Sequence, residues 1–232
     1  MAIAHDVAEH GVKMIEFTAD QLAKWEKDNQ IKQIKLIRAR LRNTPGHIHD
    51  FPGNPGKFDD QLVESALNGS KSHKNCLILC DLAYSHGRNG VVELGTNLGI
   101  SSTYLAIGAR SKNARSTIAT GDCSGKRLNI AKSVHQECGF DDIVYIEGLF
   151  ENTADNIFEA VPNWSFAFID GDHTYDGTMR YYEIARSTGV AGNCVVFDDV
   201  DWSDGMKEAW KEISRKHPFT SHKIGDMGLI IL

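Results

Sequence analysis

From about Gly90 to its end, the chain alternates short apolar runs with segments of helical period. The predicted strands are Val91–Leu94, Ser116–Thr120, Ile143–Glu147, Phe166–Ile169 and Cys194–Phe197. The predicted helices are Ile100–Ala109, Lys126–Cys138, Thr153–Ala160, Thr174–Ser187 and Asp204–Lys216. Five successive βα units predict an α/β fold, in which a mostly parallel sheet is covered by helices on both faces. Strands as apolar as these are expected to be buried on both sides.

The C-terminal end departs from that alternation. Two strand-like segments, Phe219–Ile224 and Gly228–Leu232, flank a turn at Gly225-Asp226. This pattern predicts a terminal antiparallel hairpin at the sheet edge. An all-parallel Rossmann sheet does not usually end in this way.

The residues before Gly90 form a more polar, helical pattern. Thr18 followed by Gln21 is a capping-box signal, and the helix after it is predicted as one helix or as two that are broken near Asp28-Asn29. Two further helices are predicted at Asp59–Leu67 and Lys74–Ser85. The basic side chains of this part favour a solvated helix face over an anion site. They are Lys32, Lys35, Arg38, Arg40 and Arg42.

The segment Asn43–Lys57 contains three Pro and three Gly and is predicted to be a loop. It either covers a substrate as a lid or is a passive connection. We assign His47, within it, to a substrate pocket. The predicted domains are a helical extension with this lid loop over residues 1–72 and a catalytic domain over residues 73–232.

Composition excludes several classes of protein. The 232 residues carry 25 Lys and Arg against 31 Asp and Glu, a net charge of −6, which argues against nucleic acid as a partner. No apolar run approaches the roughly 20 residues that cross a bilayer, and the first residues do not resemble a signal peptide, so we expect a cytoplasmic protein with no membrane partner. Five scattered cysteines argue against disulfides, and Cys76 and Cys80 are expected to be buried rather than to bind a metal.

The turn after the first βα strand is the most informative motif. Glu93 stands near the strand end, and Gly95 and Gly99 follow in the spacing acid-x-Gly-x-x-x-Gly. Gly95 is expected to let the backbone approach a ligand, and Gly99 to permit a tight entry into the helix. The turn either binds a cofactor or merely packs the helix on the strand.

A dinucleotide fingerprint would require a second glycine where this chain has Asn97, and a pyrophosphate would be repelled by Glu93. S-adenosylmethionine (SAM) has no phosphate and carries an ammonium and a sulfonium group, so the motif favours SAM. Asp122, after the second strand, is expected to accept hydrogen bonds from a ribose diol or to cap the next helix, a role that Ser124 could also take. Gly148, Leu149 and Phe150 follow the third strand, where an adenine would lie. The predicted cofactor-binding residues are Glu93, Gly95, Thr96, Asn97, Gly99, Ser101, Asp122, Cys123, Gly148, Leu149, Phe150 and Asp170.

At these motifs the chain resembles the class I SAM-dependent methyltransferases, over roughly Leu77–Leu232. It is similar, more narrowly, to the small-molecule O-methyltransferases of the catechol and macrocin type. The segments Phe166–Tyr175 and Val195–Trp202 carry that narrower resemblance. The resemblance implies a Rossmann-like seven-stranded sheet with an antiparallel last strand, and a hydroxylated small molecule, catechol-like or a secondary metabolite, as acceptor.

In metal-dependent members of that group, acids end the fourth and fifth strands. The matching positions here are Asp170, Asp198 and Asp199, which the resemblance assigns to Mg²⁺ or a similar divalent cation. The ion would orient the acceptor hydroxyl toward the SAM methyl group. Asp198-Asp199 replaces the Asp-Asn common in the catechol type, so metal dependence stays open.

Catechol-type enzymes carry a basic lysine three residues after the strand-end Asp, where this chain has His173. His173, with Asp170, is predicted to be catalytic, with His173 as general base; as alternatives it would ligate the metal or cap the following helix. Tyr175 and Trp202 are assigned to the substrate pocket, although Trp202, Met206 and Trp210 also fit a core pattern.

Three other functions are weighed against O-methyl transfer. They are a metal-independent N-methyltransferase, a nonenzymatic SAM-binding protein and an NAD-dependent oxidoreductase, the last disfavoured by Asn97. The amphipathic N-terminal segment is a candidate surface for a homodimer.

Overall fold

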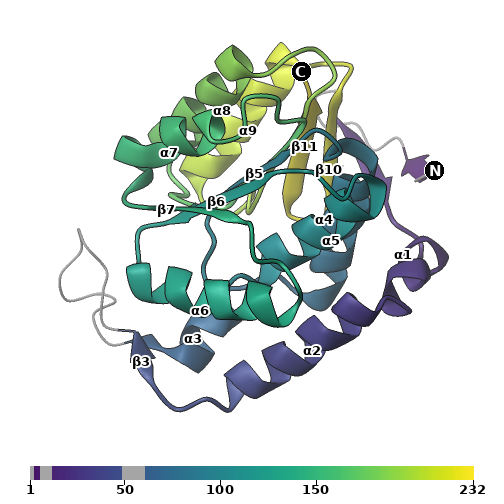
Figure 1. Ribbon diagram of the computed structural model, residues 1–232. Helices are drawn as coiled ribbons and strands as arrows, with labels where there is room; N and C mark the ends of the chain where they lie inside the picture. Colours follow the sequence, from purple (N-terminus) through teal and green to yellow (C-terminus); the bar gives the residue numbers. More distant parts are fainter. Residues whose placement is uncertain (1–2, 6–11, 49–60) are drawn as a thin grey trace.

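The computed structural model describes residues 3–5, 12–48 and 61–232 (Figure 1). Its main sheet contains β1 (Ile3–His5), β2 (Lys13–Glu16), β5 (Val91–Leu94), β6 (Ile118–Asp122), β7 (Val144–Glu147), β8 (Phe166–Ile169), β9 (Cys194–Phe197), β10 (Ser221–Ile224) and β11 (Met227–Ile231). The strand order is β1-β2-β10-β11-β9-β8-β5-β6-β7. A separate pair joins β3 (His47–Ile48) to β4 (Gln61–Leu62). Strands β5 to β9 run parallel, and β11 is antiparallel to both β9 and β10.

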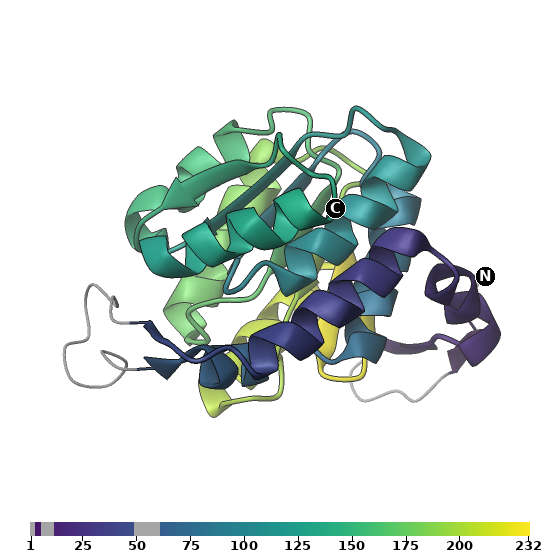
Figure 2. The same cartoon turned by 60° about the horizontal axis from the view of Figure 1, so that its bottom comes forward.

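Helices cover both faces of this sheet (Figure 1). One face carries α4 (His73–His86), α5 (Ile100–Lys112) and α6 (Gly125–Glu137), and the other carries α7 (Phe150–Glu159), α8 (Tyr175–Thr188) and α9 (Asp204–Lys216). The remaining helices are α1 (Ala19–Glu26), α2 (Asn29–Arg42) and α3 (Val63–Asn68). Figure 2 shows α2 crossing the outside of the layer that contains α5 and α6.

The central strands are buried on both sides, as predicted. Val91 belongs to the hydrophobic core under α4 and α5, whereas Val92 belongs to the core under α7 and α8. Phe166 and Phe168 alternate with Ala167 in the same way along β8. This period-2 alternation places successive side chains of each strand in two different apolar cores.

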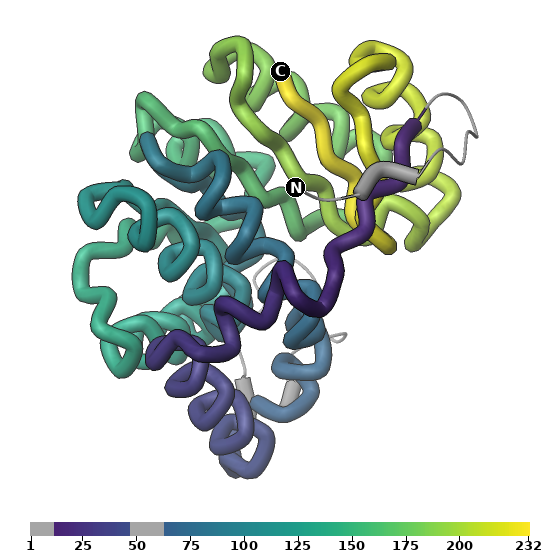
Figure 3. The backbone as a smooth tube through the Cα atoms, turned by 90° about the vertical axis from the view of Figure 1, so that its right-hand side faces the viewer, coloured from purple at the N-terminus to yellow at the C-terminus, as the bar shows by residue number. Residues whose placement is uncertain are grey.

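The predicted seven-stranded sheet with an antiparallel last strand is present as β10-β11-β9-β8-β5-β6-β7. Two strands extend it, because β2 pairs parallel with β10 and β1 pairs antiparallel with β2. Figure 3 shows β2, in purple, beside the C-terminal strands. The N-terminal part, predicted to consist of helices and a loop, therefore also contains strands, and the absence of strands from that prediction is wrong. The four residues of β2, with two apolar residues side by side, give no alternating pattern that would reveal a strand.

Most predicted boundaries agree with the structure within a few residues. The second βα strand is displaced to Ile118–Asp122, because Ile118 stands opposite Val91 and Asp122 opposite Glu147. Two helices flank Asp28, as one of the two alternatives predicted, because its carboxylate accepts hydrogen bonds from the amides of Gln30 and Ile31. The five cysteines are free thiols. Within the described ranges, no helix is long and apolar enough to cross a membrane. The boundary at residue 72 stays a prediction.

Candidate functional site

The loops after β5, β6, β8 and β9 meet at the carboxyl edge of the parallel strands. In the described residues, the non-glycine residues with positive φ are Asn97 (45°), Asp172 (48°) and Asp199 (50°), and each lies in one of these loops. Among non-glycine residues, Asn and Asp adopt a left-handed backbone most readily, and such conformations cluster at functional sites. This edge of the sheet is therefore the leading candidate for the functional site.

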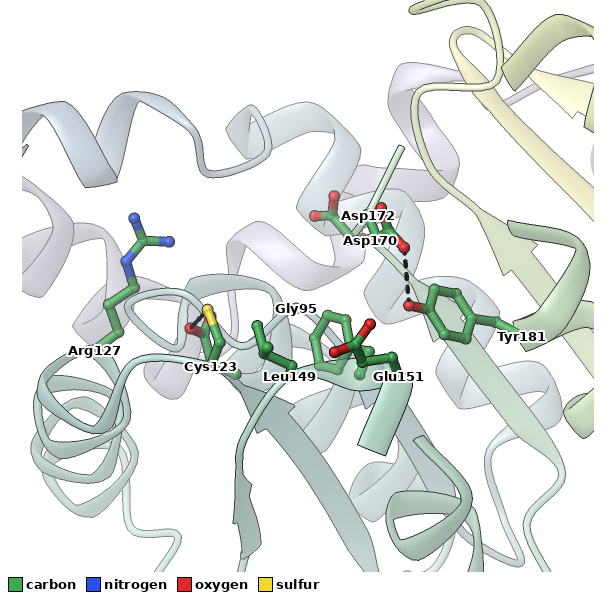
Figure 4. A pocket seen from close by; sticks show the side chains of 11 residues that line it. Gly95, Cys123, Arg127, Leu149, Glu151, Asp170, Asp172 and Tyr181 are labelled. Carbon is green, nitrogen blue, oxygen red and sulfur yellow. Dashed lines mark hydrogen bonds between the residues drawn. The ribbon is translucent and has the colours of Figure 1, made fainter. Parts of the chain in front are cut away.

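Two adjoining cavities open at this edge. The larger has a volume of about 380 Å³ and includes Cys123, Leu149, Phe150 and Tyr181 in its wall (Figure 4). The smaller has a volume of about 200 Å³ and is lined by residues of the α3–α4 segment and of the strand-end loops. Its lining includes Ser70, Lys71, Asn97, Ser101 and His173. Both cavities share Gly95, Asp122, Arg127 and Asp170, so they form two halves of one cleft.

Glu93 lies beneath the cleft and has no exposed surface. The Thr120 hydroxyl donates a 2.5 Å hydrogen bond to its Oε2, whereas its Oε1 has no hydrogen-bond partner among the described residues. Burial raises the pKa of this carboxyl to about 7. Thr96 is also fully buried, with its hydroxyl 2.6 Å from that of Thr120. Both predicted cofactor-binding residues are therefore buried against Thr120 and line neither cavity.

The two motif glycines allow close packing of backbone segments. Gly95 has φ +111°, and a Cβ there would lie 1.9 Å from the carbonyl oxygen of Asp170. Gly99 has φ +80° and precedes α5, and a Cβ there would lie 2.9 Å from Ala131 in α6. Position 95 therefore requires a glycine because the loop after β8 lies so close to it. Gly95 also lines both cavities. Gly99 permits the tight helix entry that the sequence predicts.

Asp122 connects two of the loops. Its Oδ2 accepts a 2.8 Å hydrogen bond from the Asn97 amide, and its Oδ1 accepts one of 2.9 Å from the Ser124 amide. The N-cap of α6 is Ser124, whose hydroxyl accepts from the Arg127 amide. Of the two residues that the sequence offered as the cap of this helix, Ser124 is therefore the one that caps α6. Each oxygen of the Asp122 carboxylate keeps further acceptor capacity toward the cleft that it lines.

An apolar wall closes the larger cavity on the side of β7. Phe150 packs over Gly171, where a Cβ would lie 2.4 Å from the phenyl ring. Tyr181, which no sequence motif indicated, meets Phe150 edge to face at 6.0 Å, and its hydroxyl donates a 3.2 Å hydrogen bond to Asp172. Leu149 lines the cavity as predicted, whereas Gly148 lies against Thr153 and does not line it. Tyr181 stands six residues into α8, where an aromatic side chain fits a core position equally well.

The predicted acids lie together and are joined by two residues that the sequence did not indicate. Asp198 is fully buried, and Lys71 Nζ lies 2.6 Å from its Oδ1. The same ammonium donates hydrogen bonds to Asp199 Oδ1 at 3.0 Å and to Asp226 Oδ2 at 3.2 Å. Asp226 comes from the β10–β11 turn, which was predicted only as a turn. Burial and the neighbouring Asp198 raise the pKa of Asp170 well above its usual range.

The contacts of these acids show whether they are arranged to bind the predicted divalent ion. The described residues contain one group of three acids whose oxygens lie within 4.8 Å of one another, namely Asp198, Asp199 and Asp226. These are the three carboxylates that the Lys71 ammonium contacts. Burial acts to lower the pKa of Lys71, but Asp198 and Asp199 raise it by more, so this side chain stays cationic. The acids as arranged here fit an ammonium, and metal dependence stays a prediction.

His173 stands beside this cluster. Its Nε2 lies 3.6 Å from Asp170 Oδ1 and 3.9 Å from Asp199 Oδ2. Burial lowers its pKa, which favours the neutral imidazole. Thr174 is the residue that caps α8, since its hydroxyl accepts a hydrogen bond from the Gly177 amide. The capping alternative for His173 is therefore wrong.

The three residues assigned to the substrate pocket have different outcomes. The Tyr175 hydroxyl donates a 2.6 Å hydrogen bond to Glu212 on α9, and Tyr175 lines neither cavity. Trp202 is 74% exposed and lines neither cavity, whereas Met206 and Trp210 are buried in the core. The backbone of His47 belongs to β3, but its side chain lies outside the described residues, as does most of the predicted lid loop.

The chain is similar to known methyltransferases. Residues 92–200 match the family model of a methyltransferase domain. A Mycobacterium tuberculosis protein named as an O-methyltransferase is 26% identical in an alignment of 175 positions that covers 65% of this chain and 75% of that protein. The solved O-methyltransferase of Bacillus cereus in complex with S-adenosylhomocysteine (SAH) has 20% identity and a TM-score of 0.56, over 89% of this chain and 92% of that one. TomG of Streptomyces achromogenes, in complex with SAM, has 16% identity and a TM-score of 0.61, over 88% and 90%.

Proposed function

We propose that this chain, a class I SAM-dependent methyltransferase, transfers the methyl group of SAM to a hydroxyl oxygen of a small molecule. One observation carries the proposal: a cavity of about 380 Å³ with an apolar wall adjoins one of about 200 Å³ that contains His173. The two meet at Gly95 and Asp170, so a methyl donor in the first would face an acceptor in the second.

The larger cavity has the groups that SAM requires. Asp122 would accept hydrogen bonds from the ribose hydroxyls, and Cys123, Leu149 and Phe150 would contact the adenine. Ser101 and Asn97 line the smaller cavity, so the amino acid part of SAM would extend into it from the larger one and share it with the acceptor beside His173. The buried carboxyl of Glu93, with a pKa of about 7 in the empty cleft, would be shifted to its charged form by an ammonium group bound near it.

The smaller cavity supports proton removal from a hydroxyl group. His173 lines it, and its lowered pKa makes it neutral near pH 7 and able to accept a proton. The acceptor oxygen would attack the methyl carbon while the bond from sulfur to that carbon breaks. The hydroxyl proton would pass to His173 Nε2, and the products are a methyl ether and SAH. No step here requires the predicted divalent ion.

The decisive experiment combines SAM binding with turnover. Calorimetry measures the dissociation constant for SAM, and a panel of small phenols, catechols and matched amines is then screened for SAH formation. We expect turnover with hydroxylated acceptors only. Turnover with amines alone would replace the proposal by N-methyl transfer, and SAM binding without any SAH would favour a nonenzymatic binder.

A substitution tests the proposed base. His173→Gln should lower kcat by about 10²- to 10⁴-fold with little change in SAM affinity, because a general base contributes a factor of this size to the chemical step. His217→Gln is the matched control, since His217 hydrogen-bonds to Tyr182 and lines neither cavity. An unchanged kcat in His173→Gln would refute the assignment.

A further inference from the structure

We propose that Lys71 is the built-in cation of the acid cluster, in the place of a divalent metal ion, and that methyl transfer at this site is metal-independent. The chemical part of this inference rests on the proposed function. The position of the cation is a property of the chain alone and is testable without any acceptor.

The Lys71 ammonium fills the cation position among three acids of the cluster. Its Nζ lies 2.6 Å, 3.0 Å and 3.2 Å from oxygens of Asp198, Asp199 and Asp226. A divalent ion binds carboxylate oxygens at about 2.0–2.6 Å. An ion bridging these acids would thus overlap with the ammonium or stand close enough for strong repulsion between like charges. The ammonium and a divalent ion bound to these same three oxygens are therefore mutually exclusive.

The surroundings of Lys71 hold it in this position. Its backbone carbonyl accepts a 2.6 Å hydrogen bond from Arg38, and the carbonyl of Ser70 accepts another from the same guanidinium at 3.4 Å. Ser72, the next residue, caps α4 by accepting from the Asn75 amide. Arg38, predicted to belong to a solvated helix face, thus binds this loop instead.

Burial makes withdrawal of the ammonium unfavourable. The Lys71 side chain is 9% exposed, and that of Asp198 is not exposed at all. Moving Lys71 out would leave a buried carboxylate without its cation, which is more costly than breaking a surface ion pair. A soluble divalent ion would have to displace a charge that the chain itself holds at high local concentration.

The position of Lys71 also suits the reaction. Lys71 and His173 both line the smaller cavity, and they approach the two oxygens of Asp199, with Lys71 at Oδ1 and His173 at Oδ2. An acceptor oxygen that loses its proton to His173 would develop negative charge near a fixed ammonium. A preorganised cation of this kind stabilises an oxyanion without any reorganisation during the reaction.

The test uses Mn²⁺ alone as the probe. Manganese binding to the full chain is measured by electron paramagnetic resonance and calorimetry for the wild type, for Lys71→Met and for Lys74→Met, an exposed lysine three residues on. We expect one Mn²⁺ site in Lys71→Met, with affinity at least about 100-fold higher than in the wild type, because the competing charge is gone. Lys74→Met should behave like the wild type.

The site is located by a second variant. Adding Asp198→Asn to Lys71→Met should abolish the new Mn²⁺ site and, by removing the unpaired buried charge, restore part of any lost stability. If Lys71→Met does not fold, Lys71→Gln and the wild-type titration take its place. With an active acceptor in hand, EDTA should leave the wild-type rate unchanged.

Three results would overturn the inference. One is a wild type that binds one Mn²⁺ as tightly as Lys71→Met does. Another is the absence of Mn²⁺ binding in both Lys71 variants, which would mean that the acids form no cation site. The third is loss of wild-type turnover in EDTA. Failure of SAM to bind would refute the proposed function instead, and would leave the manganese results to decide the place of the cation.

Discussion

Asp122 offers the sharpest test of the cofactor half of the cleft, through the change Asp122→Asn. In the native chain, each carboxylate oxygen accepts one backbone amide, from Asn97 at 2.8 Å and from Ser124 at 2.9 Å. An asparagine side chain has one acceptor oxygen, so its NH₂ group would face one of these two amides. The substitution therefore leaves a buried N–H without an acceptor at a position that is 5% exposed.

The expected magnitudes follow from these contacts. An unsatisfied buried donor costs about 1–3 kcal/mol. For a chain of this size, that corresponds to a fall in Tm of about 2–12 °C. The loss of charge-assisted hydrogen bonds to the ribose, each worth about 1.5–3 kcal/mol, should weaken SAM binding by about 10- to 100-fold.

Thermal unfolding and SAM calorimetry measure both effects. Asp141→Asn makes the same chemical change at an exposed residue and should alter neither quantity. A SAM dissociation constant within about twofold of the wild type in Asp122→Asn would contradict the ribose assignment, because even one lost charged hydrogen bond is worth about tenfold. A fall in Tm with unchanged SAM affinity would assign Asp122 to loop packing alone.

Three further outcomes are expected. Glu93 has a pKa of about 7 in the fold against 4.5 in the unfolded chain, so the folded state binds more protons and the free energy of unfolding falls by about 3 kcal/mol as the pH rises from 4.5 to 7. Glu93→Gln should remove this fall, and urea unfolding at pH 5 and pH 8 that shows the same change in stability for both proteins would refute it. Gly95→Ala should lower the free energy of unfolding by at least about 3 kcal/mol, because its φ is positive and the new Cβ clashes with the Asp170 carbonyl, whereas Gly192→Ala, with φ +96° and no neighbour within 4 Å, should lower it by only about 1–2 kcal/mol. Equal urea midpoints for the two variants would show that the clash relaxes freely. Tyr181→Ala should weaken SAM binding by about 10-fold, whereas Tyr181→Phe should keep most of the SAM affinity because it keeps the aromatic ring. Equal SAM dissociation constants for the two variants, measured by calorimetry, would assign the contribution to the hydroxyl group instead.

The sequence by itself determined the central architecture. Strands β5, β8 and β9 have the predicted ends, because apolar runs between glycine-rich turns have few alternatives to burial in a parallel sheet. Since parallel strands end at one edge, the sequence was also sufficient to predict that Asp122, Asp170 and Asp198 converge there. Local chemistry identified the Thr18 capping box, and it offered the break at Asp28 as one of two alternatives.

Tertiary structure alone decided which charge the converging acids meet. Lys71 lies in a polar loop 128 residues before Asp199 in the chain, and nothing local distinguishes it from the exposed Lys74. Likewise, the rotation of α8 turns Tyr181 toward the cleft and Tyr175 toward Glu212. The physical reason is that side-chain burial and the electrostatic potential depend on every element packed around a group, whereas strand and helix formation depend mainly on the residues within each segment.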